Sequence, residues 1–443
     1  MSTIPILNPK PSSQAFLDCV NNPAGVGHCH PLVVRAAADQ FSTLNTNTRY
    51  VFPELNEYAE RLCATLPSSL SVCYFVNSGS EANDLALRLA RWHTNQQDAV
   101  CVQGGYHGHT DAVIDVSPYK FDKAVNRPVP PTTHKVPAPD AYRDSRSGAA
   151  MAESIKEVVD GIRKEGRKPA LFICEGALSC AGYIPIPDGY LEAAYAHVRA
   201  HGGLCLSDEV QSGFGRPGGG MMWAFERGGV VPDMVTMGKP MGNGFPLAAV
   251  ITTREVAESF ASCGMEYFNT FGGGPVAMRV GSAVLDAMEK DDLLGHVEDV
   301  GTYLQGKLRD LQSSFSVIGD VRGHGLFLGV ELVKDRKSKK PAPLEAEWLC
   351  EALRCRGVLM NTDGIHSNVF KMKPPLCISR AHVDLLVQTL EEVLSIMPPD
   401  DATLLLPQEE VPAALARVNR VVEEWVSLAP QALKHIPETY PKP

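Results

Sequence analysis

Residues that can do chemistry follow several buried, strand-like runs of this chain. The runs "ALFICEG", "GLCLSDEV", "DMVTMGK" and "VQGGYHGHT" carry, in that order, Glu175, Asp208, Lys239 and the pair Tyr106 and His107. A carboxylate placed like Asp208 is costly to bury unless a cation meets it. A lysine placed like Lys239 can pair with that carboxylate, or it can have a lowered pKa and act as an amine nucleophile that forms a Schiff base.

A run of small polar residues, "NSGS", directly precedes the helix-forming segment "EANDLALRLARWH". Ser78 and Glu81 have the spacing of a capping box, so the run can serve simply to start the helix. The same turn leaves backbone N–H groups and the positive end of the helix dipole free to bind an anion. An anion cradle at Ser78, Gly79 and Ser80, a buried acid, an amine and an aromatic platform together favour pyridoxal phosphate as the cofactor.

The elements that would position these residues alternate between strands and helices from about Leu70 to Ala249. Apolar runs are separated by amphipathic stretches such as 151–163 and 190–201, which predicts a mostly parallel sheet covered on both faces. Ligands of such sheets bind outside the carboxyl ends of the strands. After about Asp291, amphipathic segments flank "VIGDVRGHGLFLGVELV", which alternates like an antiparallel strand pair, so we expect a smaller α+β domain there.

Composition and charge argue against several classes of protein. The chain has 443 residues, of which 44% are apolar, and its net charge of −10 argues against a nucleic-acid surface. No apolar run approaches the length of a membrane span, and the N-terminus lacks the features of a secretory peptide. The twelve cysteines are scattered without a CxxC pair. This pattern favours reduced thiols in a cytoplasmic protein and no metal site, with a mitochondrial location left open.

From Phe16 to about Ile396 the chain closely resembles the class III (ω-amino) aminotransferase family of pyridoxal-phosphate enzymes. The motifs that carry this resemblance are "NSGSEAN", "GGYHGHT", "SDEVQSGFGR", "TMGKPMGNGFP" and "NTFGGGPV". Further runs are most similar to the phospho-lyase branch of that family: "DCVNNPAGVGHCHP", "LNTNTRY", "VSPYKF", "GMEYFNTFGG" and "KMKPPLC". The branch comprises ethanolamine-phosphate phospho-lyase and 5-phosphohydroxy-L-lysine phospho-lyase.

The resemblance implies a fold and an assembly. The expected fold is α/β, with an aspartate-aminotransferase-like (fold type I) large domain over 51–290 and a smaller α+β C-terminal domain over 291–398. A shortened N-terminal arm would occupy 1–50. Residues 399–443 would form a helical tail, with a helix near 411–426. The expected assembly is a homodimer, with a tetramer as the alternative.

The resemblance also implies roles for the site residues. Lys239 would carry the cofactor as an internal aldimine and act as general base, and Asp208 would pair with the ring nitrogen. Glu175 completes the expected catalytic set. The other cofactor contacts would come from residues of the same motifs: Ser78, Gly79 and Ser80 at the phosphate, Tyr106 and Val210 on the two faces of the ring, Gln211 at its phenolic oxygen, His107 in the same pocket, and Thr270 across the dimer interface at the phosphate.

The choice between elimination and amino transfer depends on the substrate. Aminotransferases of the family commonly have an arginine just before the "PPL" segment, where this chain has Lys371 in "VFKMKPPLC". A guanidinium suits a planar carboxylate, whereas an ammonium tolerates phosphate, so this departure favours a phosphorylated amine. Arg49 and Tyr50 are further phosphate candidates, and the plainer reading of Lys371 is a solvated surface lysine.

Three functions therefore follow from the sequence. The favoured one is a lyase that acts on O-phosphoethanolamine or 5-phosphohydroxy-L-lysine. The second is an ω-amino-acid:keto-acid aminotransferase of the alanine–glyoxylate kind on the same fold. The third is a weakly active or non-catalytic member of the family, which the shortened arm makes conceivable.

Overall fold

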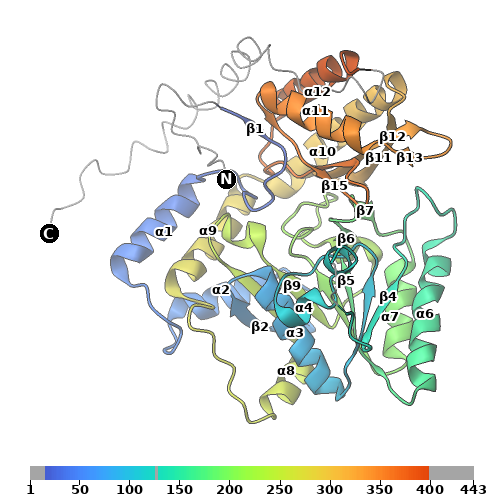
Figure 1. Ribbon diagram of the computed structural model, residues 1–443. Coiled ribbons are helices and arrows are strands. Elements are labelled where there is room, and N and C mark those ends of the chain that lie inside the picture. The colour runs from blue at the N-terminus through green and yellow to red at the C-terminus, as the bar shows by residue number, and fades with distance from the viewer. Residues whose placement is uncertain (1–14, 125–127, 399–443) are drawn as a thin grey trace.

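A computed structural model describes residues 15–124 and 128–398 of the chain. These residues form a larger α/β body, drawn in the lower part of Figure 1, and a smaller α+β body above it. The helix expected near 411–426 lies outside the described residues. Among the helices that are described, none is long and apolar enough to cross a membrane.

A seven-stranded sheet forms the centre of the larger body, in the order β2-β10-β9-β8-β5-β3-β4. The strands are β2 (Leu70–Val76), β3 (Asp98–Val102), β4 (Thr133–Val136), β5 (Pro169–Glu175), β8 (Leu204–Asp208), β9 (Met234–Met237) and β10 (Ala248–Thr253). Strands β9, β8, β5, β3 and β4 run parallel to one another, and β10 is antiparallel to both of its neighbours. The mostly parallel sheet predicted from the alternating pattern is thus confirmed.

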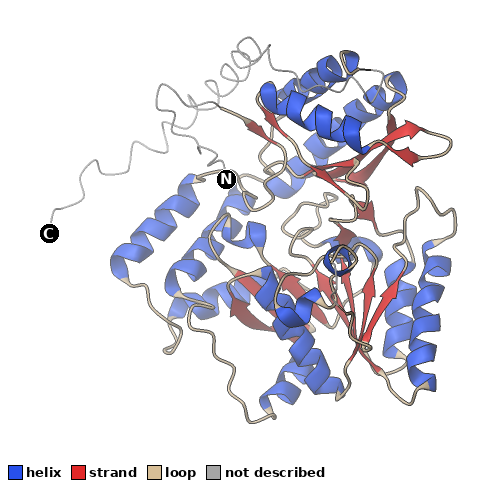
Figure 2. Ribbon diagram, in the orientation of Figure 1, coloured by secondary structure: helices blue, strands red, loops and turns tan. Residues whose placement is uncertain are grey.

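Helices cover both faces of this sheet (Figure 2). Side chains alternate along a strand, so Ala99 and Cys101 of β3 pack on one face with α3 (Gly79–Thr94) and α8 (Arg254–Ala261). Val100 and Val102 pack on the other face with α6 (Gly148–Lys164) and α7 (Tyr190–Arg199). The remaining helices of this body are α1 (Pro31–Thr43), α2 (Pro53–Cys63), the short α4 (Asp111–Ile114) and α5 (Pro118–Phe121), and α9 (Pro275–Lys290).

The smaller body packs helices on one antiparallel sheet of order β11-β12-β16-β15. Its elements are α10 (Leu293–Ser314), β11 (Ile318–His324), β12 (Phe327–Asp335), β13 (Lys340–Pro341), α11 (Pro343–Cys355), β14 (Val358–Leu359), β15 (Thr362–Asp363), β16 (Val369–Met372) and α12 (Arg380–Ser395). The run "VIGDVRGHGLFLGVELV" forms the β11–β12 hairpin that its alternation predicts. One continuous apolar core joins this body to α2 and α9 of the larger one.

The N-terminal segment packs on the smaller body. Strand β1 (Leu17–Asp18) pairs in parallel with β14. Further along, the Lys373 N–H donates to the Cys19 carbonyl at 2.8 Å, and the Leu376 N–H donates to the Gly25 carbonyl at 2.8 Å. The chain after β16 is therefore held against residues 19–25, close to the carboxyl ends of the large sheet.

Candidate functional site

A cavity of about 370 Å³ opens at the carboxyl ends of β8 and β9, and residues that follow β2 and β3 also line it. Asp208 lines this cavity, and strand register places it beside Glu175 of β5 and Thr236 of β9. Most of the predicted site residues line this cavity together: Ser78, Gly79, Ser80, Tyr106, His107, Asp208, Val210, Gln211 and Lys239. Residues from distant parts of the chain thus meet where an open α/β sheet binds its ligand.

The first turn of α3 faces this cavity. Ser78 caps the helix, and its Oγ accepts a hydrogen bond from the Glu81 N–H at 3.2 Å. A Cβ on Gly79 would lie 2.7 Å from Val210 Cγ1, so glycine is what lets the helix start approach Val210 this closely. Because the first N–H groups of a helix have no partner within it, this turn presents donors and a positive dipole end to the cavity.

Asp208 is buried and held by three hydrogen bonds. Its Oδ2 accepts from Asn83 Nδ2 and contacts His107 Nδ1, each at 2.8 Å, and its Oδ1 accepts from the Val210 N–H at 3.0 Å. Asn83 is fixed in turn, because Thr236 Oγ1 donates to its Oδ1 at 2.7 Å. The carboxylate is therefore oriented from α3 and from the segments that follow β3 and β8.

Glu175 lies behind Tyr106 and is also buried. Its carboxylate accepts from the Tyr106 N–H at 3.1 Å and from the Ser179 N–H at 3.0 Å. Burial raises the pKa of Glu175 to about 7, with a further contribution from the charge of Asp208, while His107 opposes the shift. Glu175 thus positions the backbone that carries Tyr106 and can change its charge near neutral pH.

Replacing Glu175 with Gln should remove a pH dependence from the stability of the cofactor-free protein. The folded state holds this proton more tightly than the unfolded chain, whose glutamates have a pKa of about 4.3. The free energy of unfolding of the parent should therefore fall as the pH rises from about 4.5 to 7. We expect denaturant titrations of both proteins to show this. The free energy of unfolding of the parent minus that of Glu175→Gln should change by roughly 2–3 kcal/mol between about pH 4.5 and 7. A difference that does not vary with pH would show that Glu175 is ionised in the folded protein.

Lys239 follows β9 at the start of a short 3-10 turn, Lys239–Gly242. Its φ of 38° lies in the left-handed region, which costs free energy for a residue with a side chain. Burial lowers the pKa of Lys239, and the charge of Asp208 opposes that shift. Within the described structure Lys239 and Asp208 make no ion pair, so the simple reading in which the two only neutralise each other is not supported.

A group of buried cations lies beside Gln211. Lys371 is 6% exposed and makes an ion pair with Asp363, so it is not a solvated surface lysine. Burial alone would lower the pKa of Lys371, but Cys180 and Asp363 hold it above its usual value. Lys373 is 8% exposed, and within the described residues its Nζ has one hydrogen-bond partner, Gln211 Oε1 at 3.4 Å. Burial and the charges of Lys371 and Lys239 hold the pKa of Lys373 well below its usual value.

Arg216 adds a third cation to this group. It is fully buried, and its Nη1 donates to the carbonyls of Leu326 at 3.0 Å and Pro374 at 2.9 Å. Its Nε and Nη2 have no partner among the described residues, and burial lowers the pKa of Arg216 to about 9. Buried cations without a counter-charge are costly, so this group favours an anionic ligand.

Five of the predicted residues do not line the cavity: Glu175 and Lys371, described above, and Arg49, Tyr50 and Thr270. Arg49 and Tyr50 are on an exposed loop, where the Arg49 guanidinium lies 5.7 Å from the centre of the Phe268 ring. Thr270 is on a second exposed loop, which Thr48 joins by donating to the Asn269 carbonyl at 3.1 Å. The side chain of Asn269 in turn bonds to Asn77 and Glu81 at the start of α3.

Sequence reasoning missed Asn83, Thr236, Asn269 and Lys373. Asn83 stands in the "SEAN" part of a quoted motif, and the polar residue within an otherwise apolar helix face was the available signal. Lys373 stands two residues after Lys371 and directly follows the end of β16, where the same run of charged residues was the available signal.

The residues present fit pyridoxal phosphate on three observations. Gly79 leaves room at the helix start that a Cβ would fill. The buried His107 Nε2 has no partner among the described residues. Asp208 is a buried carboxylate that no lysine or arginine neutralises within the described structure, which suits a cationic ring nitrogen.

Comparison with known proteins places this geometry in a family. The model of the family described as aminotransferase class-III matches residues 15–394. A Drosophila melanogaster relative, alanine–glyoxylate aminotransferase 2-like, is 45% identical over 86% of this chain and 79% of its own length. Ethanolamine-phosphate phospho-lyase homolog 1 of Caenorhabditis elegans is 41% identical over 87% of this chain and 86% of its own. A solved structure, an Arthrobacter phospholyase in complex with phosphoethanolamine, has a TM-score of 0.83 and 37% identity, covering 87% of this chain and 92% of that one.

Proposed function

We propose that this chain, which belongs to the class III aminotransferase family of pyridoxal-phosphate enzymes, is a phospho-lyase that acts on a phosphorylated amine. The observation that carries the proposal is the buried cation group of Lys371, Lys373 and Arg216, in which only Lys371 makes an ion pair with a carboxylate among the described residues. A phosphate group carries up to two negative charges and would supply the counter-charge that this group lacks. The substrate class would be O-phosphoethanolamine or 5-phosphohydroxy-L-lysine.

In this account each cofactor-facing residue has one task. Lys239 Nζ would hold the cofactor, and the first turn of α3 at Ser78, Gly79 and Ser80 would bind its phosphate. Asp208 would keep a proton on the ring nitrogen. At a separation of about 4 Å and an effective dielectric near 20, that pairing is worth roughly 4 kcal/mol. When bound, pyridoxal phosphate supplies a ring that accepts electrons from the carbon next to the substrate nitrogen.

The proposed reaction consumes water and releases three products. Lys239 Nζ takes a proton from the substrate carbon that bears the nitrogen. The phosphate leaves the neighbouring carbon with the electron pair of its C–O bond, and Lys373 stabilises the charge of this leaving group. The overall change converts a phosphorylated amine and one water into an aldehyde, ammonia and inorganic phosphate. No keto acid takes part.

Replacing Lys373 with Met tests the phosphate contact. The variant should raise the KM for O-phosphoethanolamine at least tenfold, because a charge-assisted hydrogen bond contributes about 1.5–3 kcal/mol. It should leave the cofactor absorbance unchanged. Its melting temperature should not fall, since an unpaired buried ammonium destabilises the folded state.

Two further measurements distinguish a role of Lys373 in phosphate binding from a role in the stability of the fold. Inorganic phosphate should raise the melting temperature of the parent holoenzyme and have little effect on Lys373→Met. Lys164→Met, a change of an exposed lysine on α6, should behave like the parent in both assays. A Lys373→Met enzyme with an unchanged KM for O-phosphoethanolamine would refute the proposed contact.

A second candidate function is amino transfer between an ω-amino acid and a keto acid. The observation that favours it is the 45% identity to the Drosophila relative, whose name is that of an aminotransferase. This candidate needs no phosphate group in the substrate, so it leaves the unpaired charge of Lys373 and Arg216 without an explanation. We therefore rank it second.

We also propose that the protein is a homodimer. Large apolar side chains are exposed together on α1 and on two loops that contact each other, including Phe41, Tyr50 and Val51 on one side and Phe268 and Phe271 on the other. Apolar groups gathered in this way indicate a surface that a partner covers. A dimer through this face would bring Thr270 to the phosphate of the partner subunit. Sedimentation velocity tests the proposal, and a monomer that binds its cofactor fully would contradict it.

A further inference from the structure

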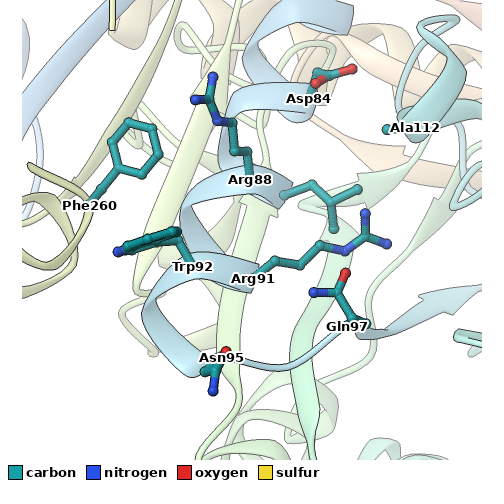
Figure 3. Close-up of a pocket in the computed structure, with 9 residues that line it drawn as sticks. Asp84, Arg88, Arg91, Trp92, Asn95, Gln97, Ala112 and Phe260 are labelled. Carbon is teal, nitrogen blue, oxygen red and sulfur yellow. The ribbon is translucent and has the colours of Figure 1, made fainter. Parts of the chain in front are cut away.

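A second hollow, of about 690 Å³, lies on the outer side of α3. Its walls come from α3 between Asp84 and Trp92, from Asn95 and Gln97 beyond the helix, and from α4 and α8, and Figure 3 shows them. The two hollows share no lining residue. Its volume falls in the range of small-molecule sites, about 300–1,000 Å³.

Two guanidinium groups line this hollow, and Asp84 is the one acidic residue of its lining. Arg88 and Arg91 are three residues apart on α3, which places like charges on one helix face. Neither makes an ion pair within the described structure. The Arg88 guanidinium lies 5.2 Å from the centre of the Phe260 ring, and its Nη2 has a weak contact with Met265 Sδ at 4.0 Å.

Arg91 is the more buried of the two cations, because Arg88 is exposed. Its Nε is shielded from solvent and has no hydrogen-bond partner among the described residues. Burial lowers the pKa of Arg91, while the more distant charges of Asp115, Asp84 and Asp98 oppose the shift. Figure 3 shows its guanidinium extending toward Gln97. The shielded Nε–H of Arg91 therefore lacks a hydrogen-bond acceptor among the described residues, which is energetically costly.

The rest of the wall offers a fixed aromatic surface and neutral donors. Trp92 is 43% exposed, and its indole N–H donates to the Ser259 carbonyl at 2.8 Å, which anchors the ring between α3 and α8. The side chains of Asn95 and Gln97 add amide groups. Asp84 is the acidic member of the wall, so the two arginines leave the lining with an excess of positive charge.

We propose that this hollow is a second ligand site, which binds a small organic anion with a planar ring and a phosphate or carboxylate group. The anionic group would pair with Arg88 and Arg91, and the ring would lie against Trp92. The site is separate from the cofactor cavity, so the proposal does not depend on the reaction that the enzyme catalyses.

Isothermal titration of the holoenzyme with phenyl phosphate tests this site. The parent should bind the probe, and Arg88→Gln/Arg91→Gln should bind it at least tenfold more weakly. Arg254→Gln, which changes an arginine of α8 that is 72% exposed, and Lys373→Met, which weakens the proposed substrate site, should each retain the binding. If the double variant fails to keep its cofactor absorbance, the single variant Arg91→Gln takes its place, and its affinity should fall at least threefold. Absence of binding to the parent, equal binding by the arginine variants, or loss of binding in Lys373→Met would overturn the proposal.

Discussion

Lys239→Ala will abolish turnover while the protein remains folded. In our account this one amine both holds the cofactor and moves the proton, and removal of a general base alone typically costs a factor of about 10²–10⁴. Loss of both tasks should therefore reduce kcat at least a thousandfold. Lys239 already has a left-handed backbone, so alanine brings no new strain at this position.

Trapping with borohydride assigns the amine directly. Reduction of the parent holoenzyme followed by peptide mapping should place the pyridoxyl group on Lys239. Methylamine added to Lys239→Ala should restore part of the activity, because a free amine can replace the missing base. A label on Lys371 or Lys373 would remove Lys239 from the proposed role.

Asp208→Asn will keep the fold and lose more than a hundredfold in kcat. The amide has nearly the same shape as the carboxylate, and it can still accept from Asn83 and His107. With the amide oxygen at the Oδ2 position, the hydrogen bond from the Val210 N–H is lost, which costs about 1 kcal/mol of stability. The ring nitrogen loses its counter-charge, and a loss of only 3 kcal/mol at the transition state slows turnover by over a hundredfold.

Glu209→Gln is the matched control for that variant. Glu209 is equally buried and adjacent in sequence, but it does not line the cavity. Its carboxylate accepts from the N–H groups of Ala224 and Phe225 at 3.0 and 2.9 Å, which ties two loops together. Glu209→Gln should therefore lower the melting temperature more than Asp208→Asn and change kcat less. If Asp208→Asn stays within threefold of the parent, Asp208 has a structural role only.

The sheet and most of the cavity residues could be predicted because short stretches of sequence determine them. Buried parallel strands read as short apolar runs, and a polar residue that ends such a run must lie at one edge of the sheet. Asp208 and Lys239 meet both conditions. The sequence also places Ser78 at a helix start, since capping needs only a short stretch of chain.

Other site residues depend on contacts between distant segments. Asn83 lies within a helix and reaches Asp208 only because α3 crosses the ends of β8 and β9. The burial of Lys371 and Lys373 could not be predicted, because charged residues in "VFKMK" read as an exposed strand edge. Contacts with Cys19 of the N-terminal segment, with Cys180 and Gln211 of the larger body and with Asp363 surround them, and pattern alone does not reveal that packing. Arg49, Tyr50 and Thr270 lie on exposed loops, and no contact within the described residues brings them to the cavity wall.

Phosphate release without a keto acid distinguishes a phospho-lyase from an aminotransferase. Purified holoenzyme is incubated with O-phosphoethanolamine or 5-phosphohydroxy-L-lysine, and inorganic phosphate and ammonia are measured in parallel. Our account predicts equal amounts of both products from at least one of these amines, with no change when pyruvate or glyoxylate is added. Absence of phosphate from both amines, together with amino transfer from an ω-amino acid to pyruvate, would contradict the phospho-lyase proposal and leave the aminotransferase in its place.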